Sequence, residues 1–252
     1  MEHLIQIIDE LHRNHGLIML KGGTEWENMD FEEIAFLNSL VLNKVPVLVK
    51  VGGVEARTDI RNLKNLGVGG ILGPLIESEY ALEKFVSTVN EIFYSEHEKP
   101  ILAINIETKN AFKEIDNILG NSAFNHIDMV VIGRLDLSLS MGKQNVDDVE
   151  VSEVIQKIID KLNQKNIHIL VGGFVNPQSA ALIKENYKVS RINTIHAVFD
   201  LSKISNISHS IIQALNFEIE LYETFKLMFP KRNLFYENRI KITRDKLSPD
   251  RL

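Results

Sequence analysis

Apolar strands that alternate with amphipathic helices constrain the fold of this chain more than any other feature of its sequence. Apolar, β-branched runs occur at residues 16–21, 46–51, 69–75, 100–107, 127–133, 167–173 and 192–199. Helical patterns, with apolar residues three and four apart, lie between them, as at 31–44, 80–93 and 151–165. Continuous apolar strands are typical of a parallel sheet covered by helices on both faces. The alternation therefore predicts an α/β fold, and a TIM-type (β/α) barrel in preference to an open sheet.

The number of predicted strands is one short of the eight that a (β/α) barrel needs. Residues 1–16 contain acidic side chains in an amphipathic helical pattern, which is not the pattern of a signal peptide. We therefore expect either a degenerate first strand or an incomplete barrel.

The alternation stops after residue 200. Residues 206–229 form one long helical pattern that Pro230 ends. Residues 231–252 contain seven Lys/Arg and three Asp/Glu, a local charge of 7 − 3 = +4. Two interpretations stay open for this segment: a helix that packs on its own barrel, or an arm that docks on a neighbouring subunit. We divide the chain into a barrel, 1–205, and a C-terminal helical extension of the same domain, 206–252.

Composition excludes several classes of function. The net charge of −6 argues against a nucleic-acid partner, which usually requires a basic surface. The chain has no cysteine, so a disulfide, a thiolate metal site and a cysteine nucleophile are excluded. No apolar run approaches the roughly 20 residues that span a bilayer. We expect a soluble, cytoplasmic protein without a membrane partner.

Polar and glycine residues gather at the ends of the predicted strands, where barrels and open α/β sheets bind their ligands. Residues at or just after these ends include Lys21, Glu25, Glu27, Lys50, Pro74, Asn105, Glu107, Gly133, Arg134, Asp136, Gly172 and Gly173. A barrel selected only for stability has little use for such a ring of charge, so we expect a binding or catalytic site there.

Glu107 and Asp136 form the sharpest pair in this ring. They follow strands that one right-handed crossover would make parallel neighbours, so their carboxylates should converge. Like charges held close together are unfavourable unless a cation lies between them, and Mg²⁺ or Mn²⁺ prefers such oxygen ligands. The alternative is that each carboxylate caps the helix that follows it.

Weaker signals surround this pair. Gly-Gly occurs in "KVGGVEARTD" (50–59) and "LVGGFVNPQS" (170–179), where backbone N–H groups either receive an anion or serve a tight turn. His168 and His196 lie inside apolar strands and are expected to be core or rim histidines. Trp26 is expected to pack beside the site more than to contact a ligand. Nucleophile-elbow, P-loop and dinucleotide-binding glycine motifs are all absent.

The motifs "INIET" (104–108) and "IGRLDLSLSMG" (132–142) resemble those of the HpcH/HpaI aldolase and citrate lyase β-subunit family. The stretches "NLGVGGILGPLIESEYALEKFV" (65–86) and "PVLVKVGG" (46–53) add to the resemblance, which covers roughly residues 16–200. The resemblance implies a modified TIM barrel with a divalent cation, Mg²⁺ or Mn²⁺, bound by Glu107 and Asp136. It also implies that the substrates form enolates of pyruvate type or of acyl-CoA type.

Transferred residue by residue, the resemblance assigns further roles. Lys50 stands where the family has an arginine that holds a carboxylate, and Asn105 stands where the aldolases often have glutamine. Gly133 matches directly, and Pro74 matches the proline of the preceding strand end. With Gly172 and Gly173, these residues are expected to bind substrate.

The chain also departs from the family. Lys50 offers a point charge in place of a bidentate guanidinium, and we expect Arg134 to supply the missing group. The aldolase "D-x-E-H" segment is absent from "KGGTEWENMDFEE" (21–33), so either Glu25 or a metal-bound water becomes the candidate base. The first strand of the family is not evident.

The leading hypothesis is a metal-dependent carbon–carbon lyase or aldolase. It would act on a 2-oxo acid such as pyruvate or oxaloacetate, with an aldehyde as partner, through an enolate. A citrate-lyase-like enzyme acting on a CoA thioester is one alternative, and a non-catalytic barrel that serves binding or assembly is another. Relatives commonly form trimers or hexamers, so the resemblance also predicts a homo-oligomer.

Overall fold

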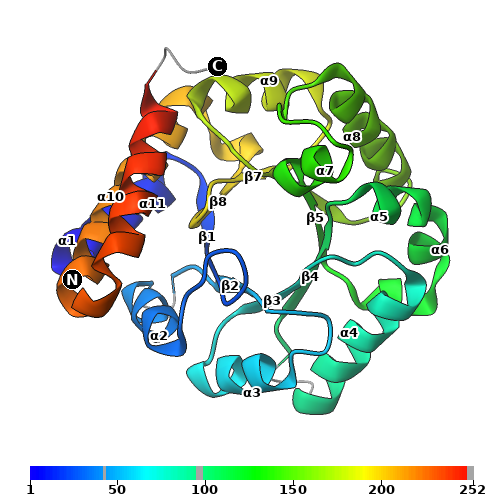
Figure 1. The fold of residues 1–252 in the computed structure, drawn as a ribbon, viewed down its shortest axis with the longest axis horizontal. Coiled ribbons are helices and arrows are strands. Elements are labelled where there is room, and N and C mark those ends of the chain that lie inside the picture. Colours follow the sequence, from blue (N-terminus) through cyan, green and yellow to red (C-terminus); the bar gives the residue numbers. More distant parts are fainter. Residues whose placement is uncertain (42–43, 95–98, 249–252) are drawn as a thin grey trace.

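A closed eight-stranded barrel forms the centre of the protein (Figure 1). The structure is a computed structural model that describes residues 1–41, 44–94 and 99–248. The strands are β1 (Leu17–Gly23), β2 (Val47–Lys50), β3 (Gly70–Gly73), β4 (Ile101–Ile106), β5 (Met129–Gly133), β6 (His168–Gly172), β7 (Arg191–Asn193) and β8 (Ala197–Asp200). The predicted TIM-type barrel is confirmed.

Helices surround the barrel (Figure 1). They are α1 (Glu2–Asn14), α2 (Phe31–Leu40), α3 (Arg57–Leu66), α4 (Glu79–Ile92), α5 (Lys109–Lys113), α6 (Ile115–Gly120), α7 (Arg134–Ser140), α8 (Val149–Leu162), α9 (Pro177–Asn186), α10 (Ile207–Met228) and α11 (Asn233–Leu247). Side-chain caps fix several starts: Asp30 and Glu33 form a capping box at α2, and the Ser78 hydroxyl accepts from Ala81 at α4. None of the described helices combines the length and apolar character that crossing a membrane requires.

The core has two parts. A small cluster fills the barrel interior and consists of Met19, Leu48, Leu72, Ala103, Met129, Val131, Leu170 and Val198. The larger cluster joins the outer faces of the strands to the helices. Both faces of the central strands are therefore buried, as the continuous apolar runs predicted.

The eighth strand arises from a segment that the sequence pattern presents as one strand. Residues 192–199 do not continue straight: the chain turns at Thr194–His196, where the Thr194 N–H bonds to the Ala197 carbonyl at 2.9 Å. The following strand, β8, runs antiparallel to both β7 and β1, while β1 to β7 are parallel. A reversed strand thus closes a barrel whose first parallel strand follows helix α1.

Buried hydrogen bonds hold this turn. His196 contacts the Lys21 carbonyl at 2.9 Å through Nδ1 and the Tyr222 hydroxyl at 2.8 Å through Nε2. Its backbone N–H donates to Glu218 at 2.8 Å. Burial lowers the pKa of His196, which favours the neutral ring. His196 is therefore a core histidine, as expected.

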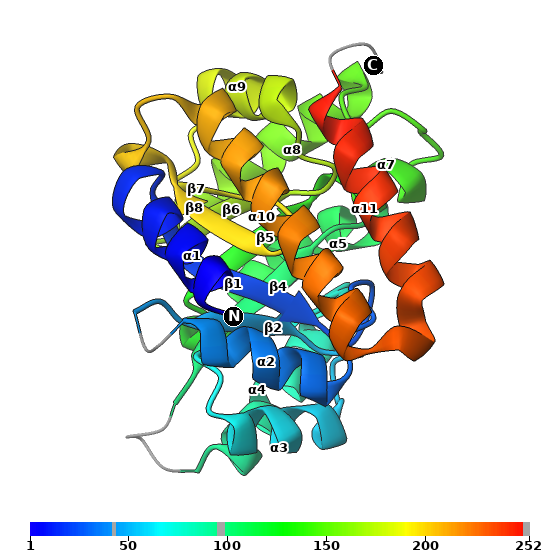
Figure 2. The same cartoon turned by 90° about the vertical axis from the view of Figure 1, so that its left-hand side faces the viewer.

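Helices α10 and α11 lie side by side, and α11 packs along one edge of the barrel (Figure 2). Tyr236 and Arg232 both bond to the buried Glu33 carboxylate of α2. The Arg239 guanidinium lies 4.0 Å from the Trp26 ring centroid and donates to the Trp26 carbonyl at 2.5 Å. The positively charged segment thus packs on its own barrel. A homo-oligomer stays a prediction, and residues 249–252 lie outside the described part.

Candidate active site

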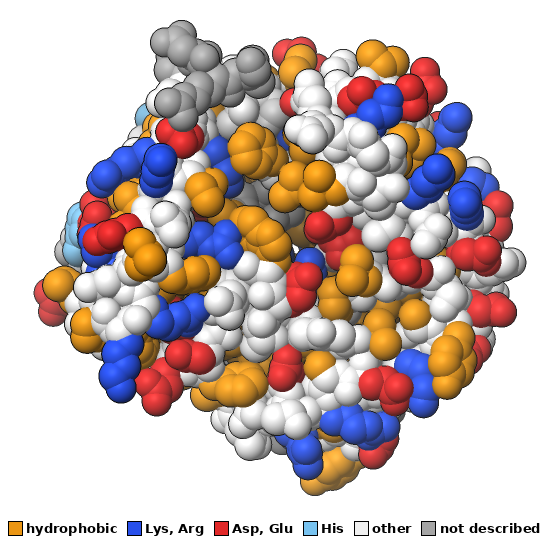
Figure 3. All heavy atoms as spheres, viewed as in Figure 1, with side chains coloured by type: hydrophobic (Ala, Val, Ile, Leu, Met, Phe, Trp, Pro, Cys, Tyr) orange, Lys and Arg blue, Asp and Glu red, His pale blue; other side chains and the backbone are white. Residues whose placement is uncertain are grey.

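A cavity of about 310 Å³ opens at the carboxyl ends of the strands. Figure 3 shows the hollow near the middle of this face, bordered by hydrophobic and charged side chains. Its lining is Lys21, Trp26, Glu27, Lys50, Asn105, Glu107, Val131, Gly133, Leu135, Asp136, Gly172, Gly173, Phe174, Val175, Asn193, Thr194, Ile195, Ile242 and Lys246. The cavity lies where strand-end ligand sites were expected.

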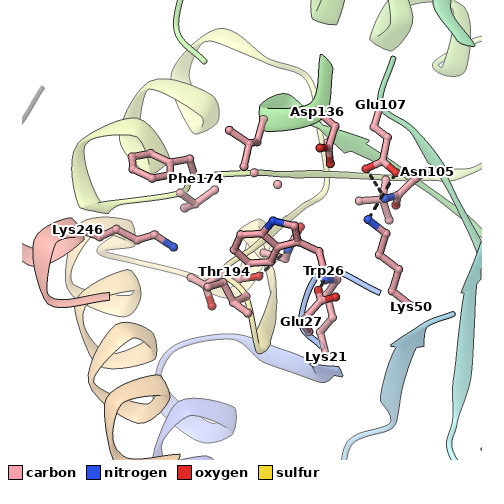
Figure 4. Close-up of a pocket in the computed structure, with 18 of the residues that line it drawn as sticks. Lys21, Trp26, Glu27, Lys50, Asn105, Glu107, Asp136, Phe174, Thr194 and Lys246 are labelled. Carbon is pink, nitrogen blue, oxygen red and sulfur yellow. Dashed lines mark hydrogen bonds and ion pairs between the residues drawn. The ribbon is translucent and has the colours of Figure 1, made fainter. Parts of the chain in front are cut away.

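Glu107 and Asp136 face this cavity from neighbouring strand ends, as predicted (Figure 4). Neither carboxylate caps a helix. Thr108, not Glu107, caps α5 by accepting from the Ala111 N–H, and Asp136 lies inside the first turn of α7. The capping alternative is therefore wrong, because the cap positions belong to other residues.

Glu107 is buried and held on three sides. The Asn105 amide donates to Oε2 at 2.5 Å, the Leu75 N–H donates to Oε1 at 3.2 Å, and Lys50 Nζ lies 3.5 Å from Oε1. Leu75 adopts a φ of 49°, the left-handed region that a branched side chain rarely occupies. Burial raises the pKa of Glu107, Lys50 and Asn105 lower it, and repulsion from Asp136 raises it again; the pKa lies above its usual value. The two carboxylates therefore repel each other across the cavity.

The donor set fits a hard divalent cation. Within the described residues, Asp136 has no hydrogen bond or ion pair, and the buried Asn105 Oδ1 has no hydrogen-bond partner. These oxygens lie beside Glu107, and oxygen is the atom that Mg²⁺ and Mn²⁺ prefer. No cluster of three or more acidic or histidine side chains suited to a metal occurs among the described residues. A cation held by Glu107 and Asp136 would take its other ligands from water or substrate.

Lys50 links Glu107 to a second carboxylate. Its Nζ lies 2.9 Å from Glu25 Oε2, which also accepts from the Trp26 N–H at 2.7 Å. Burial lowers the pKa of Lys50, but Glu107 and Glu25 outweigh burial and leave the pKa above its usual value. Lys50 therefore stays charged. Glu25 does not line the cavity, so the structure gives no support for Glu25 as a base that reaches substrate.

A second lysine–glutamate pair also lines the cavity. Lys21, from β1, forms an ion pair with Glu27 of the following loop, and both side chains are more than nine-tenths buried. The sequence placed both residues at a strand end without predicting the pair. Glu27 Oε2 is buried without a hydrogen-bond partner in the described part.

Arg134 and Pro74 do not take the positions predicted for them. The buried Arg134 guanidinium donates to Asp147 at 2.6 Å and to the Gly173 carbonyl at 3.0 Å, and it does not line the cavity. Its hydrogen bonds therefore join the segments that follow β5 and β6, and it does not replace the guanidinium missing at position 50. Pro74 is buried but also lies outside the cavity lining.

The glycines at two strand ends permit close approaches. A Cβ at Gly133 would lie 2.6 Å from Glu107 Oε2 and 2.8 Å from its Cβ, and Gly173 has a φ of 88°. Gly172 lies against the Asn193 side chain. By contrast, Gly52 and Gly53 lie outside the cavity lining, and Asp59 closes their turn by accepting from the Gly52 N–H at 3.0 Å.

Replacing Gly133 by alanine is expected to displace the Glu107 carboxylate, because the new methyl group would overlap it. Overpacking of this kind costs roughly 1–3 kcal/mol of stability. Loss of the ligand position should raise the Kd for Mn²⁺ by roughly 10–100-fold, the usual effect of disturbing a ligand's support. Thermal unfolding and an electron paramagnetic resonance titration with Mn²⁺ would measure both effects.

The matched control is Gly53→Ala, because a Cβ at Gly53 would meet no atom within 4 Å. This variant should unfold and bind Mn²⁺ as the wild type does. Wild-type Mn²⁺ affinity in Gly133→Ala would contradict the assignment of Glu107 as a ligand.

The C-terminal helix supplies residues that sequence reasoning missed. Ile242 and Lys246 of α11 line the cavity, although they lie about 110 residues beyond Asp136. Tyr236, Ile240, Thr243 and Lys246 are all buried. Their spacing of four, three and three residues places them on one helix face, a signal that the sequence does contain.

Comparison with known proteins identifies relatives of the barrel. The model of the HpcH/HpaI aldolase/citrate lyase family matches residues 33–186, more than half of the chain. This range includes Lys50, Asn105, Glu107 and Asp136 but not Lys246. No curated protein matches this chain.

Three solved structures show the same fold. An HpcH/HpaI aldolase from Desulfitobacterium hafniense DCB-2 is 20% identical, with a TM-score of 0.58 over 73% of this chain and 79% of its own. The citrate synthase SbnG is 18% identical, with a TM-score of 0.57 over 74% of this chain and 88% of its own. Macrophomate synthase is 14% identical, with a TM-score of 0.55 over 76% of this chain and 82% of its own.

Proposed function

This chain belongs to the HpcH/HpaI aldolase/citrate lyase family, and from that premise we propose that it is a divalent-metal-dependent carbon–carbon lyase. Its proposed substrate is pyruvate or a related 2-oxo acid, which reacts as the enolate. The observation that carries the proposal is the pair Glu107 and Asp136, two repelling carboxylates that face one cavity. A divalent cation between them would supply positive charge where the enolate oxygen becomes negative.

Lys50 is suited to binding the carboxylate of a 2-oxo acid. Its ammonium lines the cavity and is held by Glu25 and Glu107, so its position and its charge are both fixed. An ammonium has three N–H donors, and these two carboxylates leave one for substrate. Because its pKa is raised, Lys50 serves as a fixed charge and not as a base.

Asn105 positions the Glu107 carboxylate. Its amide nitrogen donates to Glu107 Oε2 at 2.5 Å. Its buried carbonyl oxygen has no hydrogen-bond partner in the described part of the chain. The apolar walls of the cavity, among them Val131, Leu135 and Phe174, limit access of water. Charge stabilisation is stronger where water is excluded, and this favours enolate formation here.

The reaction to be tested removes a proton from C3 of pyruvate, joins C3 of the resulting enolate to the carbonyl carbon of an aldehyde, and delivers a proton to the resulting alkoxide. Cleavage is the reverse. Exchange of the pyruvate methyl protons in D₂O isolates enolate formation, because it needs no aldehyde.

We expect the purified protein to exchange these protons, as followed by NMR, with Mg²⁺ or Mn²⁺ present. A chelator should abolish exchange, and added metal should restore it. Failure to exchange any of several 2-oxo acids, together with failure to bind either metal, would leave the non-catalytic barrel as the better hypothesis.

A further inference from the structure

The two ends of the cavity carry different chemistry. Glu107, Asp136 and Lys50 lie at one end, and Lys246 enters at the other from the last turn of α11 (Figure 4). The Lys246 side chain points into the cavity between Phe174 and Thr194 (Figure 4). Its Nζ lies 5.6 Å from the Phe174 ring centroid, and the residue is only 7% exposed.

Lys246 differs from the other two lysines of the cavity. Lys21 is paired with Glu27, and Lys50 is paired with Glu25 and Glu107. Within the described residues, Lys246 has no hydrogen bond and no ion pair. Glu218 attracts it from beyond ion-pair distance. A buried ammonium without a paired anion is costly, so a protein retains one where a ligand can supply the anion.

Thr194, which lies near Lys246 in Figure 4, and Asn193, which lies against Gly172, also line the cavity and contain unsatisfied polar atoms. The Thr194 hydroxyl and the Asn193 Oδ1 are buried, and neither has a hydrogen-bond partner in the described part of the chain. A hydroxyl can donate to an anion, while Asn193 Oδ1 can only accept and would face a protonated or hydroxyl group. Lys246 and Thr194 thus provide one charged and one neutral donor.

We propose that Lys246, with Thr194, binds an anionic group, a carboxylate or a phosphate, on the aldehyde partner of the reaction. This inference rests on the proposed function, because it assumes that the 2-oxo acid occupies the Glu107–Asp136 end. The aldehyde carbonyl would then lie between the two ends, with its anionic tail directed at α11. The C-terminal helix, which lies outside the family match, would thereby select the second substrate.

A bound anion would change the ionisation of Lys246. Burial lowers its pKa, Glu218 raises it, and Arg239 lowers it; the pKa lies below its usual value. A bound anion would stabilise the ammonium and raise that pKa again.

The test compares aldehydes that differ only in charge. Succinic semialdehyde is compared with butanal, and glyceraldehyde 3-phosphate with glyceraldehyde, each in condensation with pyruvate. We expect kcat/KM to be roughly 10–100-fold higher for an anionic aldehyde than for its neutral counterpart, the usual effect of a hydrogen bond to a charged group. The pair that shows the preference identifies carboxylate or phosphate.

Lys246→Met should abolish the preference, because kcat/KM for the anionic aldehyde should fall to that for the neutral aldehyde, chiefly through a higher KM. Lys246→Arg, which keeps the charge, should retain part of it. Lys241→Met is the control, because Lys241 lies exposed on the same helix. Equal use of anionic and neutral aldehydes by the wild type, or an unchanged preference in Lys246→Met, would overturn the inference.

Two further measurements separate this inference from the proposed function. Pyruvate methyl exchange needs no aldehyde, so absence of exchange in the wild type would count against the proposed function alone. Calorimetric titration with butyrate and with methyl phosphate tests the anion site directly. We expect one of them to bind, and at least 10-fold more weakly in Lys246→Met; binding of neither to the wild type would overturn the inference.

Discussion

Replacing Asp136 by asparagine is expected to lower the rate of metal-dependent pyruvate methyl exchange by roughly 10²–10³-fold, the usual effect of losing one electrostatic stabiliser. Asparagine keeps the size of the side chain and removes its charge. In the described residues Asp136 makes no hydrogen bond or ion pair that holds the fold. The loss should therefore appear in exchange and in metal affinity, and hardly in the Tm.

The same substitution should change the electrostatics of Glu107. Repulsion from Asp136 is one of the causes that raise the pKa of Glu107, so Asp136→Asn should lower that pKa. Infrared titration of the carboxylate band would follow it. Asp160→Asn is a suitable control, because Asp160 is an exposed carboxylate on α8 whose side chain, among the described residues, bonds only to Gln156 of the same helix. Wild-type exchange in Asp136→Asn would remove Asp136 from the proposed mechanism.

The barrel and the acidic pair were predictable from the sequence because both depend on short stretches of chain. A parallel strand buried on both faces must be apolar throughout, and its carboxyl end must meet those of its neighbours. Glu107 and Asp136 follow two such strands, so their convergence required only the order of β4 and β5. That prediction did not require the backbone or side-chain conformation of any single residue.

The remaining features depend on contacts between distant segments. The turn that creates β8 is stabilised by His196 bonds to Tyr222 and Glu218, which lie on α10 and leave no local signal in residues 192–199. Arg134 follows a strand end as a ligand-binding residue would, but its guanidinium forms an ion pair with Asp147, 13 residues later. Lys246 lines the cavity because α11 packs on the barrel. The pattern of residues 231–252 did not distinguish this arrangement from an arm that docks on a neighbouring subunit.

The buried pair Lys21–Glu27 leads to the largest expected change in stability. Lys21→Met would leave the Glu27 carboxylate buried without its ion-pair partner. Breaking a buried pair in this way costs roughly 3–5 kcal/mol. At about 2–4 °C per kcal/mol for a domain of this size, the Tm should fall by roughly 6–20 °C. Circular dichroism during heating would measure the change.

The double variant Lys21→Met/Glu27→Leu tests the cause of that loss. Replacing both charges by apolar groups of similar size is often neutral or stabilising, so the double variant should regain most or all of the lost Tm. Lys161→Met is the matched control, because its ion pair with Asp116 lies in water and should contribute little. If the double variant is as unstable as Lys21→Met, lost packing of the lysine stem, and not the unpaired charge, is responsible.

The pH dependence of stability provides an independent check on the same pair. Burial raises the pKa of Glu27, but Lys21, with Lys50, outweighs burial and leaves the pKa below the ordinary value of 4.5. A carboxyl group whose folded pKa is lowered contributes stability above its unfolded pKa, and this stability is lost as the pH falls through the folded value.

Without Lys21, burial should instead raise the pKa of Glu27, so that Lys21→Met loses stability as the pH rises through the new folded value. The difference in Tm between wild type and Lys21→Met should therefore be largest at neutral pH and shrink below about pH 4.5, where Glu27 can be protonated. A difference that stays constant across this range would show that the Glu27 charge does not cause it.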